Sequence, residues 1–175
     1  MKTLLIGLGC IAQVGKDYAA QQLKMYYDIE RVAFADTLKE DLNKLLADVG
    51  VDLFTLDKDP ALKAKLRPLM LEYGKAKRVF NQAYWINRAL SRDFTHKVTL
   101  ITDVRYENEV DKIKDLGGYY VHIVSDVPPS NAEEEKNQPI LSACANFKVY
   151  NAFTPAYVQD LRSLVDTLLE EDVSV

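Results

Sequence analysis

The chain has 175 residues, of which 48% are hydrophobic and 27% are charged, a balance typical of a globular domain that buries its own core. The formal net charge of −4 and the presence of only two cysteines argue against a nucleic-acid coat protein, a ligand of anionic membranes and a disulfide-stapled fold. No run approaches the roughly 20 apolar residues of a membrane span. We therefore expect a cytoplasmic protein with a single domain over residues 1–175 and no nucleic-acid or membrane partner.

The first half of the chain alternates short apolar runs with helical spacing. Residues 3–8 form a compact apolar run bounded by glycines, which predicts a buried parallel strand, and residues 16–27 continue as a helix. A second strand is predicted at residues 31–35. Three more helices follow, at residues 37–49, 61–73 and 84–93. Asp36 is a good N-cap for the first of these, and Gly74 is well placed to end the second.

The second half continues the alternation. Strands are predicted at residues 97–102, 119–124 and 147–150, with helices at residues 108–116 and 155–170. Residues 125–146 contain three of the six prolines and the acidic run Glu133–Glu135, so we expect a small lid-like loop with a solvated acidic surface. Such alternation predicts an α/β fold, a doubly wound parallel sheet flanked by helices, whose ligands bind beyond the carboxyl ends of the strands.

A glycine-bearing loop follows the first strand and ends in Gly15-Lys16 at the start of a helix. Backbone N–H groups of such a loop surround a phosphate, and the helix adds the partial positive charge of its N-terminus. The lysine brings an ammonium group to the outer phosphates. This P-loop arrangement predicts that nucleotide phosphates bind at Gly9, Gln13, Val14, Gly15, Lys16, Asp17 and Tyr18. A strand-to-helix turn without a ligand is the alternative.

Two positions of the loop differ from the usual pattern of glycine, four residues, Gly-Lys and a hydroxyl residue. Cys10 stands at the first glycine position, and Asp17 stands at the hydroxyl position that normally ligates Mg²⁺. A carboxylate is also a good Mg²⁺ ligand, directly or through water. Asp17 is therefore the candidate metal ligand, and capping of the helix is its alternative role.

Several blocks of the chain follow one another in the same order as the motifs of one enzyme family. Gly15-Lys16-Asp17 is similar to the family's variant loop, although Tyr18 replaces the usual threonine. The segment Phe34 to Lys39 resembles "FADPLK", and Leu66 to Gly74, followed by Arg78 and Trp85, resembles "(L/V)RxLLQxxG". The segment Ile101 to Glu109 closely matches "ITDVRFxNE", and Val149-Tyr150-Asn151 resembles a C-terminal "IxN".

In these blocks the chain resembles the deoxynucleoside monophosphate kinases of the bacteriophage type. The resemblance implies a nucleoside monophosphate kinase-like fold and a set of site residues. Lys16, Arg67, Arg78 and Arg105 are implied to neutralise and position phosphates, with Asp103 setting the geometry of the metal or the acceptor. Asn151 is implied on the side of the nucleotide cofactor, and Asp36 and Trp85 on the side of the acceptor. Structural roles are the alternatives: Asp36 as an N-cap, Trp85 as a core residue, and the helical arginines as solvated side chains.

The implied function is phosphorylation of a deoxynucleoside 5′-monophosphate to the diphosphate, with ATP and Mg²⁺, in the cytoplasm of a host cell if the gene is carried by a phage. Residues 125–146 contain no arginine, whereas related kinases often use lid arginines to neutralise transition-state charge. A catalytically weak or inactive nucleotide-binding protein on the same fold is therefore an alternative, and another small-molecule P-loop kinase is a third. A homodimer is compatible with the sequence.

Overall fold

The computed structural model describes residues 3–9 and 11–173. Cys10, at the first glycine position of the loop, lies outside them. The chain folds into two compact units. The first, which we call the sheet unit, comprises the residues up to Val32 and those from Asp93 onward, and the second, the helical unit, comprises Ala33–Arg92.

The sheet unit is built on five parallel strands in the order β2-β3-β1-β4-β5. Their bounds are Leu4–Gly9 for β1, Ile29–Val32 for β2, Val98–Val104 for β3, Tyr119–Val124 for β4 and Phe147–Tyr150 for β5. The predicted parallel α/β sheet is confirmed. The chain crosses from β1 to β2, returns to β3 beside β1, and then continues on the other side of β1. Ligands of such sheets bind where the strand order reverses, beyond the carboxyl ends of β1 and β3.

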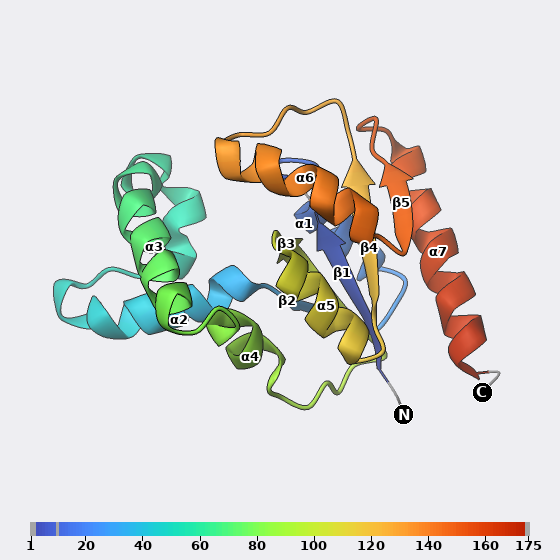
Figure 1. Cartoon of the computed structure of the whole chain (residues 1–175), viewed down its shortest axis with the longest axis horizontal. Helices are drawn as coiled ribbons and strands as arrows, with labels where there is room; N and C mark the ends of the chain where they lie inside the picture. The colour runs from blue at the N-terminus through green and yellow to red at the C-terminus, as the bar shows by residue number, and fades with distance from the viewer. Residues whose placement is uncertain (1–2, 10, 174–175) are drawn as a thin grey trace. The chain divides into compact units, whose positions relative to one another are not determined.

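Helices cover both faces of this sheet (Figure 1). Helices α1 (Lys16–Leu23) and α7 (Pro155–Val173) pack with Leu4, Ile6 and Leu8 in one apolar core. Helices α5 (Glu107–Asp115) and α6 (Ala132–Cys144) lie on the opposite face, where α5 approaches β1 so closely that a Cβ on Gly7 would stand 2.5 Å from Ile113. Because successive side chains of β1 point to opposite faces, the buried strand serves both cores.

Helix α6 differs from the loop expected at residues 125–146. Asn131 precedes the helix in an extended conformation, and its side chain accepts a hydrogen bond from the backbone N–H of Glu134 at 2.9 Å. This N-cap satisfies one of the free N–H groups of the first turn. Pro139 lies inside the helix. The prolines and the acidic run therefore predicted a loop where the chain forms a helix of 13 residues, whose N-cap is Asn131.

The helical unit contains α2 (Phe34–Leu45), α3 (Pro60–Phe80), α4 (Tyr84–Leu90) and two short 3₁₀ helices, Ala47–Val49 and Leu53–Lys58. The expected end of a helix at Gly74 is wrong, because α3 continues to Phe80. Gly74 is buried where α3 meets α2, and a Cβ there would stand 2.9 Å from Leu38. The glycine therefore permits close helix packing and does not stop the helix.

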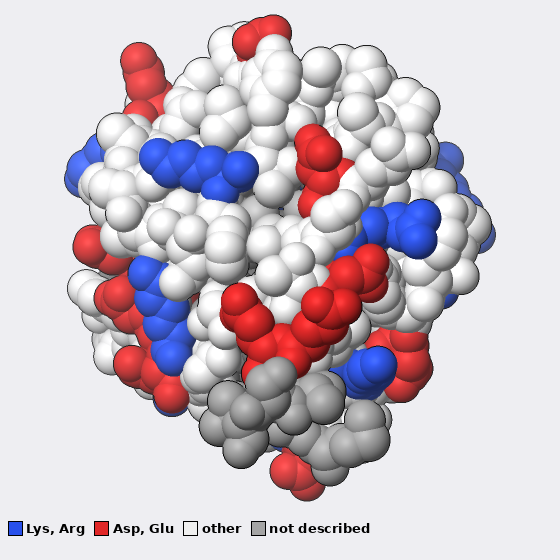
Figure 2. All heavy atoms as spheres, turned by 90° about the vertical axis from the view of Figure 1, so that its right-hand side faces the viewer, with Lys and Arg blue, Asp and Glu red and all other residues white. Residues whose placement is uncertain are grey.

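On the face of the protein that bears α7, acidic and basic side chains are interspersed (Figure 2). This mixture is typical of a solvated surface. Within residues 3–9 and 11–173, every helix is too short or too polar to cross a membrane.

Candidate active site

The loop between β1 and α1 has the backbone of an anion-binding turn. Gln13 and Gly15 both have left-handed backbones, with φ of 62° and 80°, and flank Val14. Alternation of left- and right-handed residues turns successive N–H groups toward one side, which creates a concave site for an anion. The loop ends at Gly15, the N-cap of α1, so the partial positive charge of that helix is added to the same place. Residues 11–16 therefore have a backbone that could bind an anion, and phosphate binding there stays a prediction.

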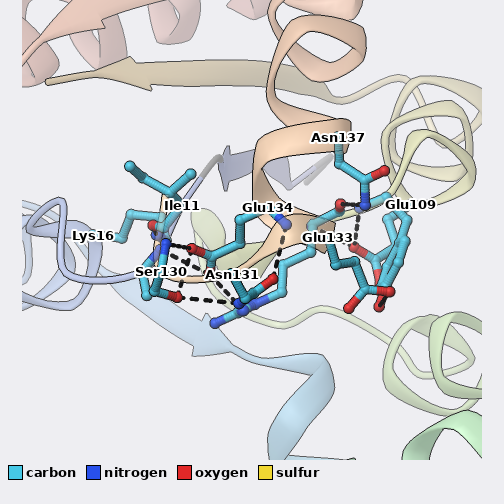
Figure 3. Close-up of polar contacts among 11 residues, drawn as sticks. Ile11, Lys16, Glu109, Ser130, Asn131, Glu133, Glu134 and Asn137 are labelled. Atoms are coloured by element: carbon cyan, nitrogen blue, oxygen red, sulfur yellow. Dashed lines mark hydrogen bonds and ion pairs between the residues drawn. The ribbon is translucent and has the colours of Figure 1, made fainter. Parts of the chain in front are cut away.

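Lys16 begins α1 and is only 8% exposed. Its ammonium group donates a hydrogen bond to the carbonyl oxygen of Ile11, so the side chain folds back over the loop (Figure 3). An ammonium held over a turn of N–H groups adds a full positive charge to the site. Tyr18, in the same first turn of the helix, is by contrast 54% exposed.

Asn151 supports the loop from behind. It follows β5, is 3% exposed, and donates its side-chain amide to the carbonyl oxygen of Val14 at 3.0 Å. Its side-chain oxygen accepts from the N–H of Phe153 at 2.7 Å, which fixes the orientation of the amide. The structure thus brings Asn151 to the predicted phosphate loop, where it contacts the backbone of the loop.

Asp17, the candidate metal ligand, lies between two partners. Its Oδ1 accepts hydrogen bonds from Nε of Arg31 at 3.1 Å and from the hydroxyl of Thr102 at 3.2 Å. The carboxylate is 75% exposed, and no cluster of three or more His, Cys, Asp or Glu side chains that could hold a metal occurs among the described residues. A carboxylate and a hydroxyl at the phosphate loop fit Mg²⁺, which takes few protein ligands and completes its shell with phosphate oxygens and water.

Arg105 follows β3, next to the loop, as predicted from the "ITDVRFxNE" resemblance. Its backbone N–H and that of Tyr106 donate to the Oε2 atom of Glu109, at 2.7 and 3.1 Å. Glu109 is 3% exposed and lies in the first turn of α5, where a negative charge is also favoured by the helix dipole. The final glutamate of the motif therefore fixes the turn that carries Arg105. Asp103 lies in the same strand end and is half-buried.

Glu134 of α6 lies against both the loop and Arg105 (Figure 3). Its Oε1 accepts from the N–H of Ala12 at 3.2 Å and from a guanidinium N–H of Arg105 at 3.0 Å. The expectation that the whole acidic run is solvated is wrong for this residue, which is 6% exposed. Burial alone would raise the pKa of the Glu134 carboxyl, but hydrogen bonds from Ser130, the charge of Arg105 and the Ala12 N–H hold it below its usual value.

His122 lies in β4, opposite Gly9 at the end of β1. It is 2% exposed, and its Nδ1 lies 3.1 Å from the hydroxyl oxygen of Tyr120, whose ring also closes the space beside Gly9. Burial lowers the pKa of His122 to about 4, and the charges of Lys148 and Lys16 act in the same direction. The imidazole is therefore neutral at pH 7 and adds no positive charge to the site.

Arg67 and Arg78 both lie on α3 in the helical unit. They are eleven residues apart, which is close to three helical turns, so they share one face of the helix. At 1.5 Å per residue, roughly 16 Å of helix axis separates them. Each stays a predicted phosphate ligand.

The remaining acceptor-side candidates also lie in the helical unit. Trp85 is 2% exposed and donates its indole N–H to the carbonyl oxygen of Gly74 at 3.1 Å, with Tyr84 packed edge-on against it. These contacts are those of a core residue, and its stacking on a base stays a prediction. The N-cap alternative for Asp36 is wrong, because α2 begins earlier, at Phe34, and its N-cap is Ala33. Asp36 lies in the first turn and pairs with Lys39 at 3.7 Å.

Four residues of the site were missed from the sequence: Arg31, Thr102, Glu109 as a support, and Glu134. The spacing of Asn131 and Glu134 is that of an N-cap and its third helical residue, so it offered a signal for the buried glutamate. The contact between Arg31 and Asp17 had no signal in the sequence, because it depends on where β2 ends relative to α1.

Comparisons with known proteins bear on the fold and the family of the chain. No protein with a curated description matched the sequence. Among solved structures, the protein TT1252 from Thermus thermophilus has a TM-score of 0.52 at 16% identity, over 97% of this chain and 98% of that one. Shikimate kinase from Bacteroides thetaiotaomicron has a TM-score of 0.47 at 12% identity, over 93% and 98% of the two chains. Dephospho-CoA kinase from Campylobacter jejuni has a TM-score of 0.45 at 11% identity, over 98% of each chain. The first of these likenesses supports the shared fold alone.

A family model gives the stronger result. The model described as phosphomevalonate kinase matches residues 11–118, which include the predicted phosphate loop from Ile11 onward, the whole helical unit and the Arg105 turn. This match extends over more than half of the chain. The protein therefore belongs to the phosphomevalonate kinase family.

Proposed function

We propose that this protein transfers the γ-phosphoryl group of ATP to a small molecule that already carries a phosphate monoester, and that the acceptor is a deoxynucleoside 5′-monophosphate. The observation that carries the proposal is the left-handed turn at Gln13 and Gly15 with the Lys16 ammonium folded over it. The kinase family of the chain supports the reaction type. The ordered sequence blocks shared with deoxynucleoside monophosphate kinases support the acceptor.

The chemistry of the acceptor fits the residues of the sheet unit. In the reaction, the bond between the γ-phosphorus and the bridging oxygen of ADP breaks, and a bond to an oxygen of the acceptor phosphate forms. A phosphate monoester has a second pKa of about 6, so it is a dianion at pH 7 and no base is needed to remove a proton. The task of the protein is then to position the phosphates and neutralise their charge. Lys16, Arg105 and the loop N–H groups suit that task.

Mg²⁺ fits the same scheme. Asp17 and Thr102 would hold the ion beside the phosphate loop, where it would shield the negative charge of the triphosphate. Release of Asp17 from Arg31 would be needed for close coordination, whereas coordination through water would allow the ion pair to persist. In the helical unit, Arg67, Arg78, Asp36 and Trp85 remain the proposed acceptor-side residues.

A second acceptor is favoured by one observation, the family match. The name of that family refers to phosphomevalonate, which is also a phosphorylated small molecule, so the same dianionic nucleophile would be used.

The arginine-free segment 125–146 favours a slow enzyme over a fast one. Both points are settled by measuring turnover with a panel of acceptors.

The test is ADP release, measured by a coupled assay with MgATP and each of the common deoxynucleoside monophosphates, phosphomevalonate and shikimate. We expect turnover with one or more of the monophosphates. Lys16→Ala should lower it at least about a hundredfold while the protein still folds, because the substitution removes a charge from the outer phosphates. Lys24→Ala, which removes an exposed lysine just after α1, is the matched control. Turnover with shikimate or phosphomevalonate alone would refute the proposed acceptor, and unchanged turnover in Lys16→Ala would refute the proposed site.

A further inference from the structure

The two oxygens of the Glu134 carboxylate have different partners. Oε1 accepts from the Ala12 N–H and from Arg105, as described above. Oε2 accepts from the N–H and the hydroxyl of Ser130, at 2.9 and 2.8 Å. One side of the carboxylate thus faces the candidate active site, and the other is held by the segment that leads into α6 (Figure 3). Its neighbours Glu133 and Glu135 are exposed.

The donors on Oε1 are of the two kinds that hold phosphate in kinases. One is a backbone N–H of the phosphate loop, and the other is a guanidinium N–H at the end of the neighbouring strand. A carboxylate oxygen and a phosphate oxygen are both anionic acceptors that take hydrogen bonds from such donors. They therefore compete for the same N–H groups, and two anions placed side by side would repel each other.

We propose that Glu134 is an internal anion that occupies the phosphate donors of Ala12 and Arg105, so that docking of its carboxylate and binding of a substrate phosphate there exclude each other. The inference rests on the proposed function. Substrate binding then requires the Glu134 side chain to break its hydrogen bonds with the Ala12 N–H and with Arg105. Because Ser130 and the N-cap Asn131 bind Glu134 locally, the start of α6 moves with it. The segment at residues 125–146 acts in this way as a lid that closes on the site with its own negative charge.

A small hollow lies beside the contact between Glu134 and Arg105. It is lined by Arg105, Tyr106 and residues of α6, including Glu133 and Asn137. Tyr106 donates its hydroxyl to Glu133 at 2.9 Å, and Asn137 donates its amide to the carbonyl oxygen of Arg105 at 3.1 Å. The Tyr106–Glu133 bond would break as the start of α6 moves, whereas Asn137, one turn further along the helix, can keep its bond to the Arg105 turn.

The experiment is calorimetric titration of the full chain with MgATP and, separately, with the preferred deoxynucleoside monophosphate. Glu134→Gln keeps the shape of the side chain and removes its charge. We expect it to bind at least one of the two ligands about fivefold to twentyfold more tightly than the wild type, because the competing anion is lost. Glu135→Gln is the matched control, since it removes the same charge from an exposed position of the same helix. It should stay within about twofold of the wild type.

Ser130→Ala provides a second route to the same result. It removes one donor from Oε2 and leaves Ala12 and Arg105 untouched, so it should tighten binding in the same direction by a smaller factor. Equal affinity in Glu134→Gln and the wild type overturns the inference. Weaker binding in Glu134→Gln also overturns it, because a glutamate that merely orients Arg105 would have that effect. Failure of every protein, including the variants, to bind either ligand overturns the proposed function together with the inference.

Discussion

Asn151 donates its side-chain amide to the carbonyl oxygen of Val14 at 3.0 Å, and this bond joins the end of β5 to the middle of the phosphate loop. Val14 lies between the two left-handed residues of the loop, so its carbonyl orientation fixes the direction of the neighbouring N–H groups. The loop is therefore held in its anion-binding shape by a residue 137 positions away in sequence.

The first prediction follows from this bond. Asn151→Ala leaves the Val14 carbonyl and the Phe153 N–H without their partner, which should lower the free energy of unfolding by about 1–3 kcal/mol. The affinity for MgATP should fall about tenfold, because the loop loses its support. Asn146→Ala is the control. Asn146 accepts from the Tyr120 N–H at 2.9 Å at the opposite end of β5, so its loss should cost stability and leave MgATP affinity unchanged.

The second prediction concerns Gly15. Gly15→Ala forces a left-handed backbone with φ of 80° on a residue with a Cβ, and that Cβ would stand 2.7 Å from Nδ2 of Asn151. The left-handed conformation costs about 1–2 kcal/mol by itself, and displacement of Asn151 adds to it. We expect a larger loss of stability than that and no measurable nucleotide binding. Gly50→Ala separates the two effects, because Gly50 has φ of 69° and open space where its Cβ would lie. Equal losses of stability in the two variants would show that the contact of the new Cβ with Asn151 adds nothing to the loss.

The central strands and the phosphate loop were predictable because local signals and tertiary packing agree there. The apolar run of β1 predicts a buried strand, and Gly15-Lys16 marks the turn after it. Gly74 shows the opposite case. Its type predicts a helix end, but packing against Leu38 keeps it inside α3. A short-range signal gave the wrong answer because the reason for the glycine lies on another helix.

The prediction of a fully solvated acidic run in α6 failed for a related reason. Three consecutive glutamates indicate a solvated surface, and two of them, Glu133 and Glu135, are exposed. Glu134 is buried because the cap at Asn131 sets the helix phase that turns it toward Ala12 and Arg105. Neither of those contacts, 122 and 29 residues away, has a local sequence signal.

The third prediction tests the support of Arg105. Glu109→Ala would leave the N–H groups of Arg105 and Tyr106 without their acceptor in a half-buried turn, and should lower the free energy of unfolding by about 2–4 kcal/mol. Turnover should fall with it, because the guanidinium is no longer held at the strand end. Glu109→Gln retains an acceptor oxygen and should recover part of both losses. Asp111→Asn, an exposed change on the same helix, should alter neither quantity, and a similar loss there would contradict the assigned role.

The fourth prediction concerns the pH dependence that His122 gives to stability. Its pKa is lowered from 6.5 to about 4 in the folded protein, chiefly by burial. Between pH 6.5 and 4 the unfolded chain binds a proton that the folded chain does not, so the free energy of unfolding falls as the pH falls through this window. Each pH unit contributes at most about 1.4 kcal/mol, which amounts to about 3 kcal/mol across the window, and the effect levels off below pH 4.

The measurement is urea unfolding at pH 7 and at pH 4.5 for the wild type and for His122→Gln. The variant should be less stable than the wild type at pH 7, because the contact with Tyr120 is altered, but should lose about 2–3 kcal/mol less on acidification. His96→Gln is the control for a second histidine, 41% exposed, and should retain the wild-type response. Carboxylates such as Glu134 are present in every variant, so they cancel in the comparison. The same loss of unfolding free energy on acidification in His122→Gln as in the wild type would mean that the pKa of His122 is not lowered in the folded protein.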